Sequence, residues 1–266
     1  MAKAVVLLRD SPAYRRSAFI GGLATLGFKV FTETVHLGEG DCLVIWNRYG
    51  RYHQSAKEAE KQGARVLVAE NGYLGRDADN GPWYAIAESA HNGAGLWPAR
   101  RQVPKESRRH LLRATCLPWH TCGGDIVLLP QRGIGLAGVA MPLGWTERTL
   151  FLLKRQYPKT KFRVRTHPGK NEVKPLLEDL KSASAVVTWG SGAAIKSLTY
   201  GVPVFYEFDQ WIGAPASASW TDFPERYCCD DAREFMLERL AWAQWRLSEI
   251  EDGTAFKELL YGHHIS

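Results

Sequence analysis

The clearest chemical signal in the sequence is a glycine-rich turn in the second half of the chain. Residues 185–205 read AVVTWGSGAAIKSLTYGVPVF, so an apolar strand leads through Gly190, Ser191 and Gly192 into a helix. Backbone N–H groups point outward at such a turn, and the helix dipole adds partial positive charge. Glycine lets a phosphate approach the backbone, while Ser191 adds a hydroxyl and Lys196 an ammonium group. The pattern predicts an anion site, and an ordinary strand-to-helix turn is the alternative interpretation.

Polar side chains also follow the two preceding strands of this half. Arg132 comes after the predicted strand 126–130, and Arg165 and His167 lie at the end of the predicted strand 162–165. Ligands of open α/β sheets bind outside the carboxyl ends of parallel strands, so we expect these side chains to converge with the glycine-rich turn. A cluster of Arg, His and Lys at one sheet edge is suited to an anionic ligand.

These segments resemble the donor-binding half of GT-B-fold glycosyltransferases. The resemblance rests on strand-Arg-x-His-Pro, followed by strand-Gly-Ser and Ser197-Leu198-x-x-Gly-x-Pro-Val. It is nearest to capsule-polysaccharide Kdo transferases and related phage-encoded enzymes. The segments 70–74 (ENGYL) and 91–93 (HNG) are similar to parts of the N-terminal half of that group.

The resemblance implies that His167 and the turn at 190–192 contact the phosphates of a nucleotide-sugar donor. An acceptor hydroxyl would attack the anomeric carbon while Arg165, Lys196 and the turn stabilise the departing phosphate. One position departs from the family, because Lys196 stands where a glutamate usually binds the ribose. Lysine has no acceptor for hydroxyl hydrogen bonds, so the identity of the nucleotide stays open.

An inverting transferase also needs a general base in its acceptor-binding half. The candidates are Glu70, Asp10, Glu88 and His91. Glu70 has the best position because it follows the predicted strand 65–69. A capping or ion-paired carboxylate is the alternative role for the acids.

Arginine and tryptophan residues are interleaved between the two halves of the chain. A basic stretch with aromatic side chains is typical of a nucleic-acid surface, and indoles stack on both bases and sugars. Together with the net charge of +6, this stretch favours an acceptor in double-stranded DNA, a hydroxylated base of the kind found in phage DNA. The residues assigned to acceptor binding are Trp97, Arg100, Arg101, Arg108, Arg109 and Trp119.

Other interpretations remain open for the function. The acceptor is alternatively a capsule or lipid-linked glycan, with the basic stretch a solvated linker and its tryptophans in the core. A third interpretation is a nucleotide- or nucleic-acid-binding module without catalysis.

The elements expected to position these residues alternate between strands and helices in both halves. This pattern predicts the α/β class, with two Rossmann-like domains facing a cleft as in GT-B folds. The expected domains are 1–118 for the acceptor, 119–240 for the nucleotide sugar, and C-terminal helices at 241–266 that cross back to the first domain. Residues 71–95 are rich in Gly, Asn and Asp and are expected to form long loops, and a short helix is expected at 106–114.

Composition excludes several classes of protein. The chain has 266 residues, 45% of them hydrophobic, and lacks an apolar run of the about 20 residues that span a bilayer. With no signal-peptide pattern at the start, a cytoplasmic location is expected. Asp77 and Asp79 form a weak D-x-D pattern, and Cys116, His120 and Cys122 lack a fourth ligand. We therefore predict no metal and no cofactor other than the nucleotide sugar as co-substrate; the sequence does not indicate the oligomeric state.

Overall fold

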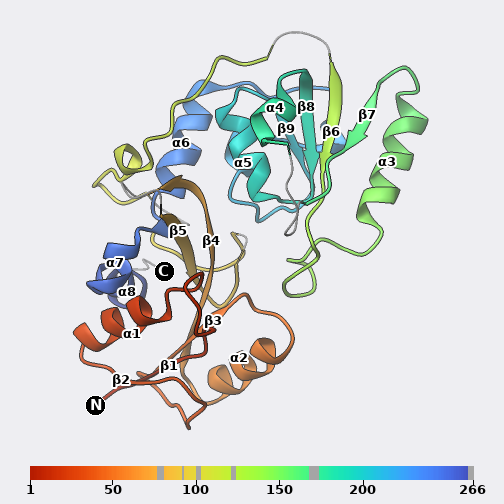
Figure 1. The fold of residues 1–266 in the computed structure, drawn as a ribbon. Helices are drawn as coiled ribbons and strands as arrows, with labels where there is room; N and C mark the ends of the chain where they lie inside the picture. Colours follow the sequence, from red (N-terminus) through yellow and green to blue (C-terminus); the bar gives the residue numbers. More distant parts are fainter. Residues whose placement is uncertain (77–80, 92, 100–102, 121–123, 168–173, 263–266) are drawn as a thin grey trace. The chain divides into compact units, whose positions relative to one another are not determined.

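The chain folds into two compact α/β units. The computed structural model describes residues 1–76, 81–91, 93–99, 103–120, 124–167 and 174–262. Unit 1 comprises Met1–Leu112 and Glu238–Ser266, and unit 2 comprises Arg113–Leu237. Figure 1 shows a sheet with flanking helices in each unit.

Unit 1 is built on a six-stranded sheet in the order β11-β5-β4-β3-β1-β2. Its parallel strands are β1 (Lys3–Val6), β2 (Lys29–Phe31), β3 (Cys42–Trp46) and β4 (Arg65–Arg76), and β5 (Pro82–Glu88) and β11 (Gln244–Trp245) add antiparallel pairs at one end. The helices are α1 (Arg16–Thr25), α2 (Arg51–Lys61), α7 (Leu247–Glu251) and α8 (Thr254–Tyr261). Helices α1, α7 and α8 lie on one side of the sheet and α2 on the other (Figure 1). Both faces are therefore covered, which fits the nearly continuous apolar runs Ala4–Val6 in β1 and Cys42–Trp46 in β3.

The C-terminal helices belong to unit 1 because α1 allows their close approach. A Cβ atom on Gly22 of α1 would lie 1.8 Å from the backbone oxygen of Ile250 in α7. Glycine at this position therefore lets the two helix backbones meet. Phe256 of α8 packs against Phe19 of α1, with ring centroids 5.9 Å apart.

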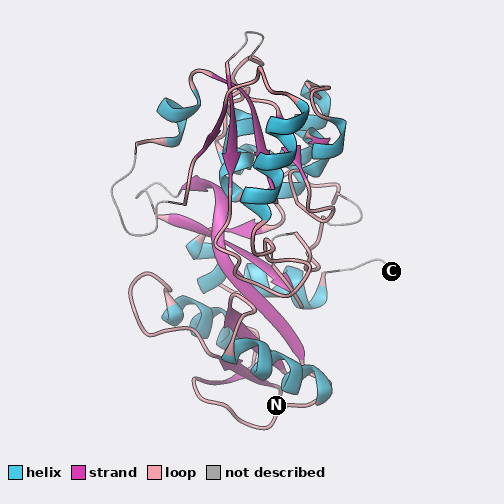
Figure 2. Cartoon of the chain, turned by 90° about the vertical axis from the view of Figure 1, so that its right-hand side faces the viewer, coloured by secondary structure: helices cyan, strands magenta, loops and turns pink. Residues whose placement is uncertain are grey.

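The expectation of long loops at 71–95 is wrong. Strand β4 continues to Arg76 and pairs with β5, and Figure 2 shows β4 as a long, curved strand. The glycines that suggested loops instead leave room for the neighbouring strand β5. A Cβ atom on Gly72 would lie 2.7 Å from the backbone oxygen of Trp83. Glycine inside a strand often marks such a close backbone approach.

Unit 2 has a five-stranded parallel sheet in the order β10-β9-β8-β6-β7. The strands are β6 (Asp125–Leu129), β7 (Phe162–Val164), β8 (Ala183–Thr188), β9 (Val204–Tyr206) and β10 (Ala218–Ser219), and the helices are α3 (Trp145–Gln156), α4 (Leu176–Leu180), α5 (Gly192–Thr199) and α6 (Asp230–Leu240). The neighbour of β6 is β7 on one side and β8 on the other. Strand order therefore reverses between β6 and β8, which is where open α/β sheets bind ligands.

The segment between the halves is fixed by backbone contacts of unit 2. The N–H of Leu117 donates to the oxygen of Thr199 at 2.8 Å, and the N–H of His120 donates to that of Gly201 at 2.7 Å. The division consequently falls at Leu112, whereas the sequence suggested residue 118. The helix expected at 106–114 is limited to a 3₁₀ turn at Arg109–Leu112. No helix in the described part of the chain is long and apolar enough to cross a membrane.

Candidate functional site

The turn after β8 is held in one conformation by its own hydroxyl groups. Thr188 Oγ1 accepts a hydrogen bond from the N–H of Ser191 at 3.0 Å and donates to the oxygen of Leu129 at 2.9 Å. Ser191 is the N-cap of α5, and its Oγ accepts from the N–H of Ala193 at 3.2 Å. The first turn of α5 therefore starts directly at the reversal point of the sheet, with Gly192 as its first residue.

Gly190 brings three strand ends together at this point. Gln131, which follows β6, donates from Nε2 to the oxygen of Gly190 at 3.1 Å. A Cβ atom on Gly190 would lie 3.2 Å from Phe208 and 3.3 Å from Trp211, which follow β9. Glycine therefore allows this aromatic loop to pack against the turn. Gln131, Phe208 and Trp211 were missed from sequence, although each follows a predicted strand.

Arg132 and His167 come together at the ends of β6 and β7. Both side chains are exposed. Partial burial and then the positive charge of Arg132 lower the pKa of His167 below its ordinary value of 6.5. At neutral pH the imidazole is therefore neutral and able to donate one hydrogen bond beside a guanidinium group. An anion at this edge would meet both groups.

Arg165 does not join this pair. Its Nη1 lies 2.6 Å from Oδ2 of Asp179, and its Nη2 donates to the oxygen of Lys174 at 2.8 Å. Burial alone would raise the pKa of Asp179, but hydrogen bonds and charge from Arg165 and Arg163 hold it below its ordinary value of 3.8. The expectation that Arg165 contacts an anionic ligand is thus corrected, because its charge is neutralised within unit 2.

Lys196 lies on the exposed side of α5. It is four residues after Gly192, which corresponds to about 6 Å along the helix axis. The hydrogen bonds that fix the turn are made by Thr188, Ser191 and Gln131. Lys196 is therefore set back from the end of α5 that faces the sheet edge.

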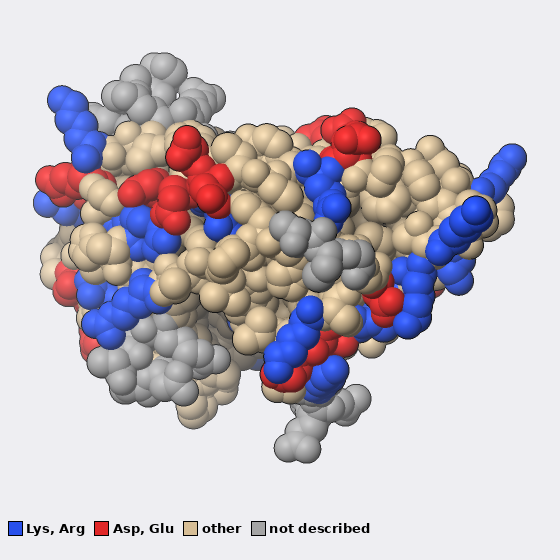
Figure 3. Space-filling view, turned by 90° about the horizontal axis from the view of Figure 1, so that it is seen from above, with Lys and Arg blue, Asp and Glu red and all other residues tan. Residues whose placement is uncertain are grey.

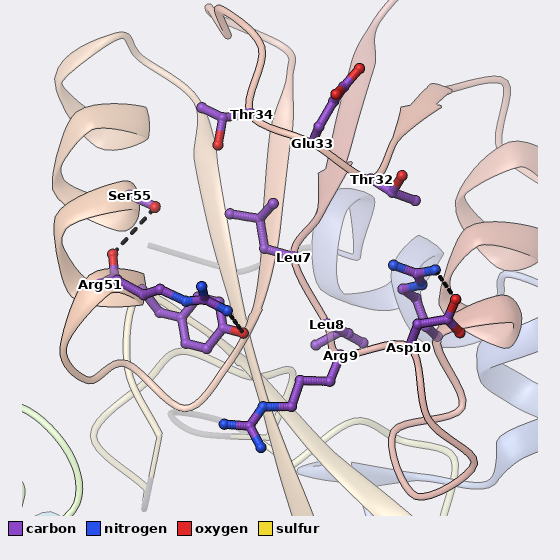
Figure 4. A pocket seen from close by; sticks show the side chains of 11 residues that line it. Leu7, Leu8, Arg9, Asp10, Thr32, Glu33, Thr34, Arg51 and Ser55 are labelled. Carbon is purple, nitrogen blue, oxygen red and sulfur yellow. Dashed lines mark hydrogen bonds and ion pairs between the residues drawn. The ribbon is translucent and has the colours of Figure 1, made fainter.

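Unit 1 has a pocket of about 480 Å³ at the carboxyl ends of β1 and β2 (Figure 4). The first turns of α2 close its other side. Asp10, one of the four candidate bases, lines the pocket with its side chain 81% exposed, and Arg16 Nη2 lies 2.5 Å from its Oδ2. The lining residues are Leu7, Leu8, Arg9, Asp10, Arg16, Thr32, Glu33, Thr34, Arg51, Tyr52 and Ser55.

Sequence reasoning missed most of this pocket. Thr32, Glu33 and Thr34 directly follow β2, and Arg51 opens α2 after β3. Their positions at strand ends were the available signal. The pocket combines hydroxyl groups with carboxylates and guanidinium groups, a set that can hydrogen-bond a polar ligand from several directions.

The other three candidate bases lie elsewhere. Glu70 lies within β4 and accepts a hydrogen bond from the hydroxyl of Tyr73 at 2.7 Å, so the expectation that it follows a strand end is wrong. Burial and then the charge of Glu70 raise the pKa of Tyr73 well above its ordinary value of 10.0. Glu88 accepts two hydrogen bonds from Arg65 at 2.9 and 2.6 Å. His91 is buried.

Among the described residues of the predicted basic and aromatic surface, two have structural roles in unit 1. Trp97 is buried in the core of unit 1. Arg108 binds both oxygens of Glu249, at 2.7 and 3.1 Å, and its guanidinium lies 4.4 Å from the ring centroid of Trp245. The two charged side chains are only 11% and 7% exposed. Arg108 therefore has a structural ion pair, and the expectation that it contacts an acceptor is corrected.

Two further residues of that stretch belong to different units. Arg109 is half-buried in the 3₁₀ turn of unit 1. Trp119 belongs to unit 2, where its Nε1 donates to Asp230 at 2.8 Å and Arg233 stacks 4.2 Å from its ring. Arg100 and Arg101 lie outside the described residues, as do Asp77, Asp79 and Cys122. Within the described ranges, no group of three or more His, Cys, Asp or Glu could hold a metal ion.

Comparison with known proteins gives similarity at the level of structure. No protein-family model and no curated protein matches the chain. The beta Kdo 2,4 transferase of KpsC from Thermosulfurimonas dismutans is similar with a TM-score of 0.53 and 15% identity, over 91% of this chain and 90% of that one. The beta Kdo 2,7 transferase of the same protein is similar with a TM-score of 0.56 and 11% identity, over 97% and 100% of the two chains. The chain therefore has the α/β fold of these structures, with two Rossmann-like domains.

Proposed function

We propose that this chain is a glycosyltransferase that moves a sugar from a nucleotide-sugar donor to a hydroxyl group of a glycan. The observation that carries the proposal is the carboxyl edge of the unit 2 sheet, where Arg132, His167 and the start of α5 follow the neighbouring strands β6, β7 and β8. The fold shared with two Kdo transferases supports the same reaction class. A nucleotide-activated Kdo is accordingly the first donor to test.

In this proposal the donor phosphates bind at the start of α5. Backbone N–H groups of the first helical turn and the Ser191 hydroxyl provide hydrogen bonds, and the helix dipole adds positive charge. The guanidinium of Arg132 balances the negative charge of the phosphate, and the imidazole of His167 donates a hydrogen bond to it. These groups stabilise the leaving phosphate as its bond to the anomeric carbon breaks.

The pocket of unit 1 would hold the acceptor, with Asp10 as the general base. The acceptor oxygen forms the new bond to the anomeric carbon, and its proton passes to the Asp10 carboxylate. The ion pair with Arg16 would orient that carboxylate. Of the four candidates, Asp10 alone lines the pocket, while Glu70 and Glu88 have partners within the sheet.

The same pocket favours a glycan over DNA as the acceptor. A cavity of about 480 Å³ has the size of a small-ligand site. Two of the residues assigned to DNA, Trp97 and Arg108, are instead part of the folded core of unit 1. A capsule or lipid-linked glycan thus fits the observations better than a duplex.

Activity of the full chain on a panel of nucleotide sugars tests the proposal. Release of nucleotide should be accelerated by a suitable glycan acceptor and not by hydroxymethylated duplex DNA. Asp10→Asn should lower transfer by about 10²- to 10⁴-fold while nucleotide-sugar binding stays unchanged. Glu39→Gln, which changes an exposed acid of unit 1 outside the pocket, is the matched control.

Three outcomes would contradict the proposal. Normal transfer by Asp10→Asn would remove Asp10 from the mechanism. Stimulation by the duplex alone would restore DNA as the acceptor. Nucleotide binding without turnover of any donor would indicate a binding module that lacks catalysis.

A further inference from the structure

Helix α3 of unit 2 has an outward face that the proposed reaction does not use. Its inner face packs on the sheet through Trp145, Thr149 and Leu153, which are buried and spaced four residues apart. The opposite face carries Phe151, which is 64% exposed. Leu152, seven residues after Trp145, lies at the border of the buried face and is 36% exposed. Leu143, just before the helix, is fully exposed.

Three exposed cations lie near these apolar side chains, and exposed Glu147 lies on the same face of α3, one turn before Phe151. Lys154 and Arg155 are exposed on the last turn of α3, and Lys159 is exposed just beyond it. Among the described residues none of these three has a carboxylate within ion-pair distance, whereas Arg148 is paired with Glu207 at 2.5 Å. Figure 3 shows Lys and Arg side chains gathered at the right-hand end of the view, where α3 and β7 lie.

This composition distinguishes between two kinds of partner. The centre of a protein–protein interface is depleted of charge, and Lys in particular is rare there. Exposed Phe and Leu side chains bordered by Lys and Arg are instead typical of helices that lie on an anionic membrane surface. The cations attract lipid headgroups while the apolar side chains enter the boundary with the acyl chains.

We propose that the α3 face, comprising Leu143, Phe151, Leu152, Lys154, Arg155 and Lys159, docks unit 2 on an anionic phospholipid surface. The contact is peripheral and reversible, since only three apolar side chains enter the lipid. It does not depend on the transfer reaction, because none of these six residues is assigned to the donor site, the acceptor pocket or catalysis. It would keep the enzyme at the surface where a lipid-linked acceptor is found.

Co-sedimentation of the full chain with phospholipid vesicles tests this proposal. The chain should bind vesicles that contain phosphatidylglycerol and not vesicles of phosphatidylcholine alone, and added salt should weaken the binding. Lys154→Gln with Arg155→Gln should weaken it by about 30-fold, from about 1 kcal/mol for each cation near the surface. Phe151→Ser should weaken it by about tenfold and leave the salt dependence intact.

A variant of unit 1 gives the matched control. Lys57→Gln with Lys61→Gln removes the same charge from exposed positions of α2 and should leave vesicle binding nearly unchanged. Thermal unfolding should be the same for all these variants because the altered side chains are exposed. Equal loss of binding in the α3 and α2 double variants would indicate attraction by net charge alone and overturn the proposal. Failure to bind anionic vesicles at low salt would also overturn it.

Discussion

Two arginine-containing regions look equivalent in the sequence and differ in the folded chain. Arg108 of unit 1 lies against the rings of Trp242 and Trp245 and is paired with Glu249, 141 residues later in the chain. Arg132 of unit 2 is exposed beside His167 at the end of the sheet. The first arginine stabilises the fold, and the second remains available for a ligand.

The difference shows what makes a cation available for binding. A charged side chain that leaves water needs a partner, and Glu249 is supplied to Arg108 by the C-terminal segment. Arg165 is neutralised in the same way by Asp179, although it lies near His167 in sequence. Counting the arginines in a segment therefore does not show whether they bind a ligand. What decides it is whether the tertiary structure places a carboxylate beside each of them.

Replacement of Arg108 should have the largest effect on stability. Arg108→Ala leaves Glu249 buried without its main partner, so we expect a loss of about 3–5 kcal/mol in the free energy of unfolding. Arg132→Ala should change it by less than about 0.5 kcal/mol, since the side chain is exposed. Urea denaturation of the two variants measures both values.

A double variant tests whether the unpaired charge of Glu249 causes this loss of stability. Arg108→Met with Glu249→Leu removes both charges and should recover most of the lost stability. Equal stability of Arg108→Ala and the unmodified chain would mean that the ion pair with Glu249 is not formed.

For nucleotide-sugar affinity we expect the opposite ranking: replacing Arg132 should have a large effect and replacing Arg108 almost none. Arg132→Ala and His167→Ala each remove one hydrogen-bonding group from the donor phosphates, so we expect about 10- to 100-fold weaker nucleotide-sugar binding with little change in unfolding. Arg108→Gln should leave this affinity unchanged, because Arg108 belongs to unit 1. Isothermal titration calorimetry provides the affinities, and undiminished binding by both Arg132→Ala and His167→Ala would refute the donor site.

The ion pair of Arg165 and Asp179 should be visible in the pH dependence of stability. The pKa of Asp179 is depressed on folding, so its contribution is fully present above the unfolded value near 3.8 and is lost as pH falls through the lower folded pKa. The Asp179→Asn variant should therefore have a lower free energy of unfolding than the unmodified chain at pH 6. The difference between the two values should become smaller below about pH 4. Urea denaturation at a series of pH values tests this, and a gap that is constant with pH would contradict it.

The smallest expected effect concerns His167 itself. Arg132→Gln should raise the pKa of His167 toward 6.5 without reaching it, because partial burial is the larger cause of the shift. NMR titration measures the value, and the spectrum of His167→Gln assigns the signal among the eight histidines. An unchanged pKa would mean that Arg132 and His167 are farther apart than described.

Much of the fold was predictable from local patterns. The apolar runs at 42–46, 126–130 and 185–189 predicted strands of the two sheets, and β3, β6 and β8 occupy nearly the same residues. The glycine-rich turn at 190–192 was also recognised, because Gly-Ser-Gly between a strand and a helix is a local signal. The sequence predicted too short a strand β4 because Asn71, Gly72 and Gly75 usually indicate loops. In the structure Asn71 pairs with Tyr84 of β5, and the two glycines leave room for Trp83.

The sequence by itself determined the α/β class, the parallel strands and the glycine-rich start of α5, since each depends on residues that are neighbours in the chain. Tertiary structure alone decided which polar side chains serve the fold and which remain exposed. Glu249 reaches Arg108 and Asp179 reaches Arg165 through folding, whereas Asp10 joins Glu33 and Arg51 around one pocket. The physical reason is that the energy of a charged group depends on its burial and its partners, and both are set by segments distant in sequence.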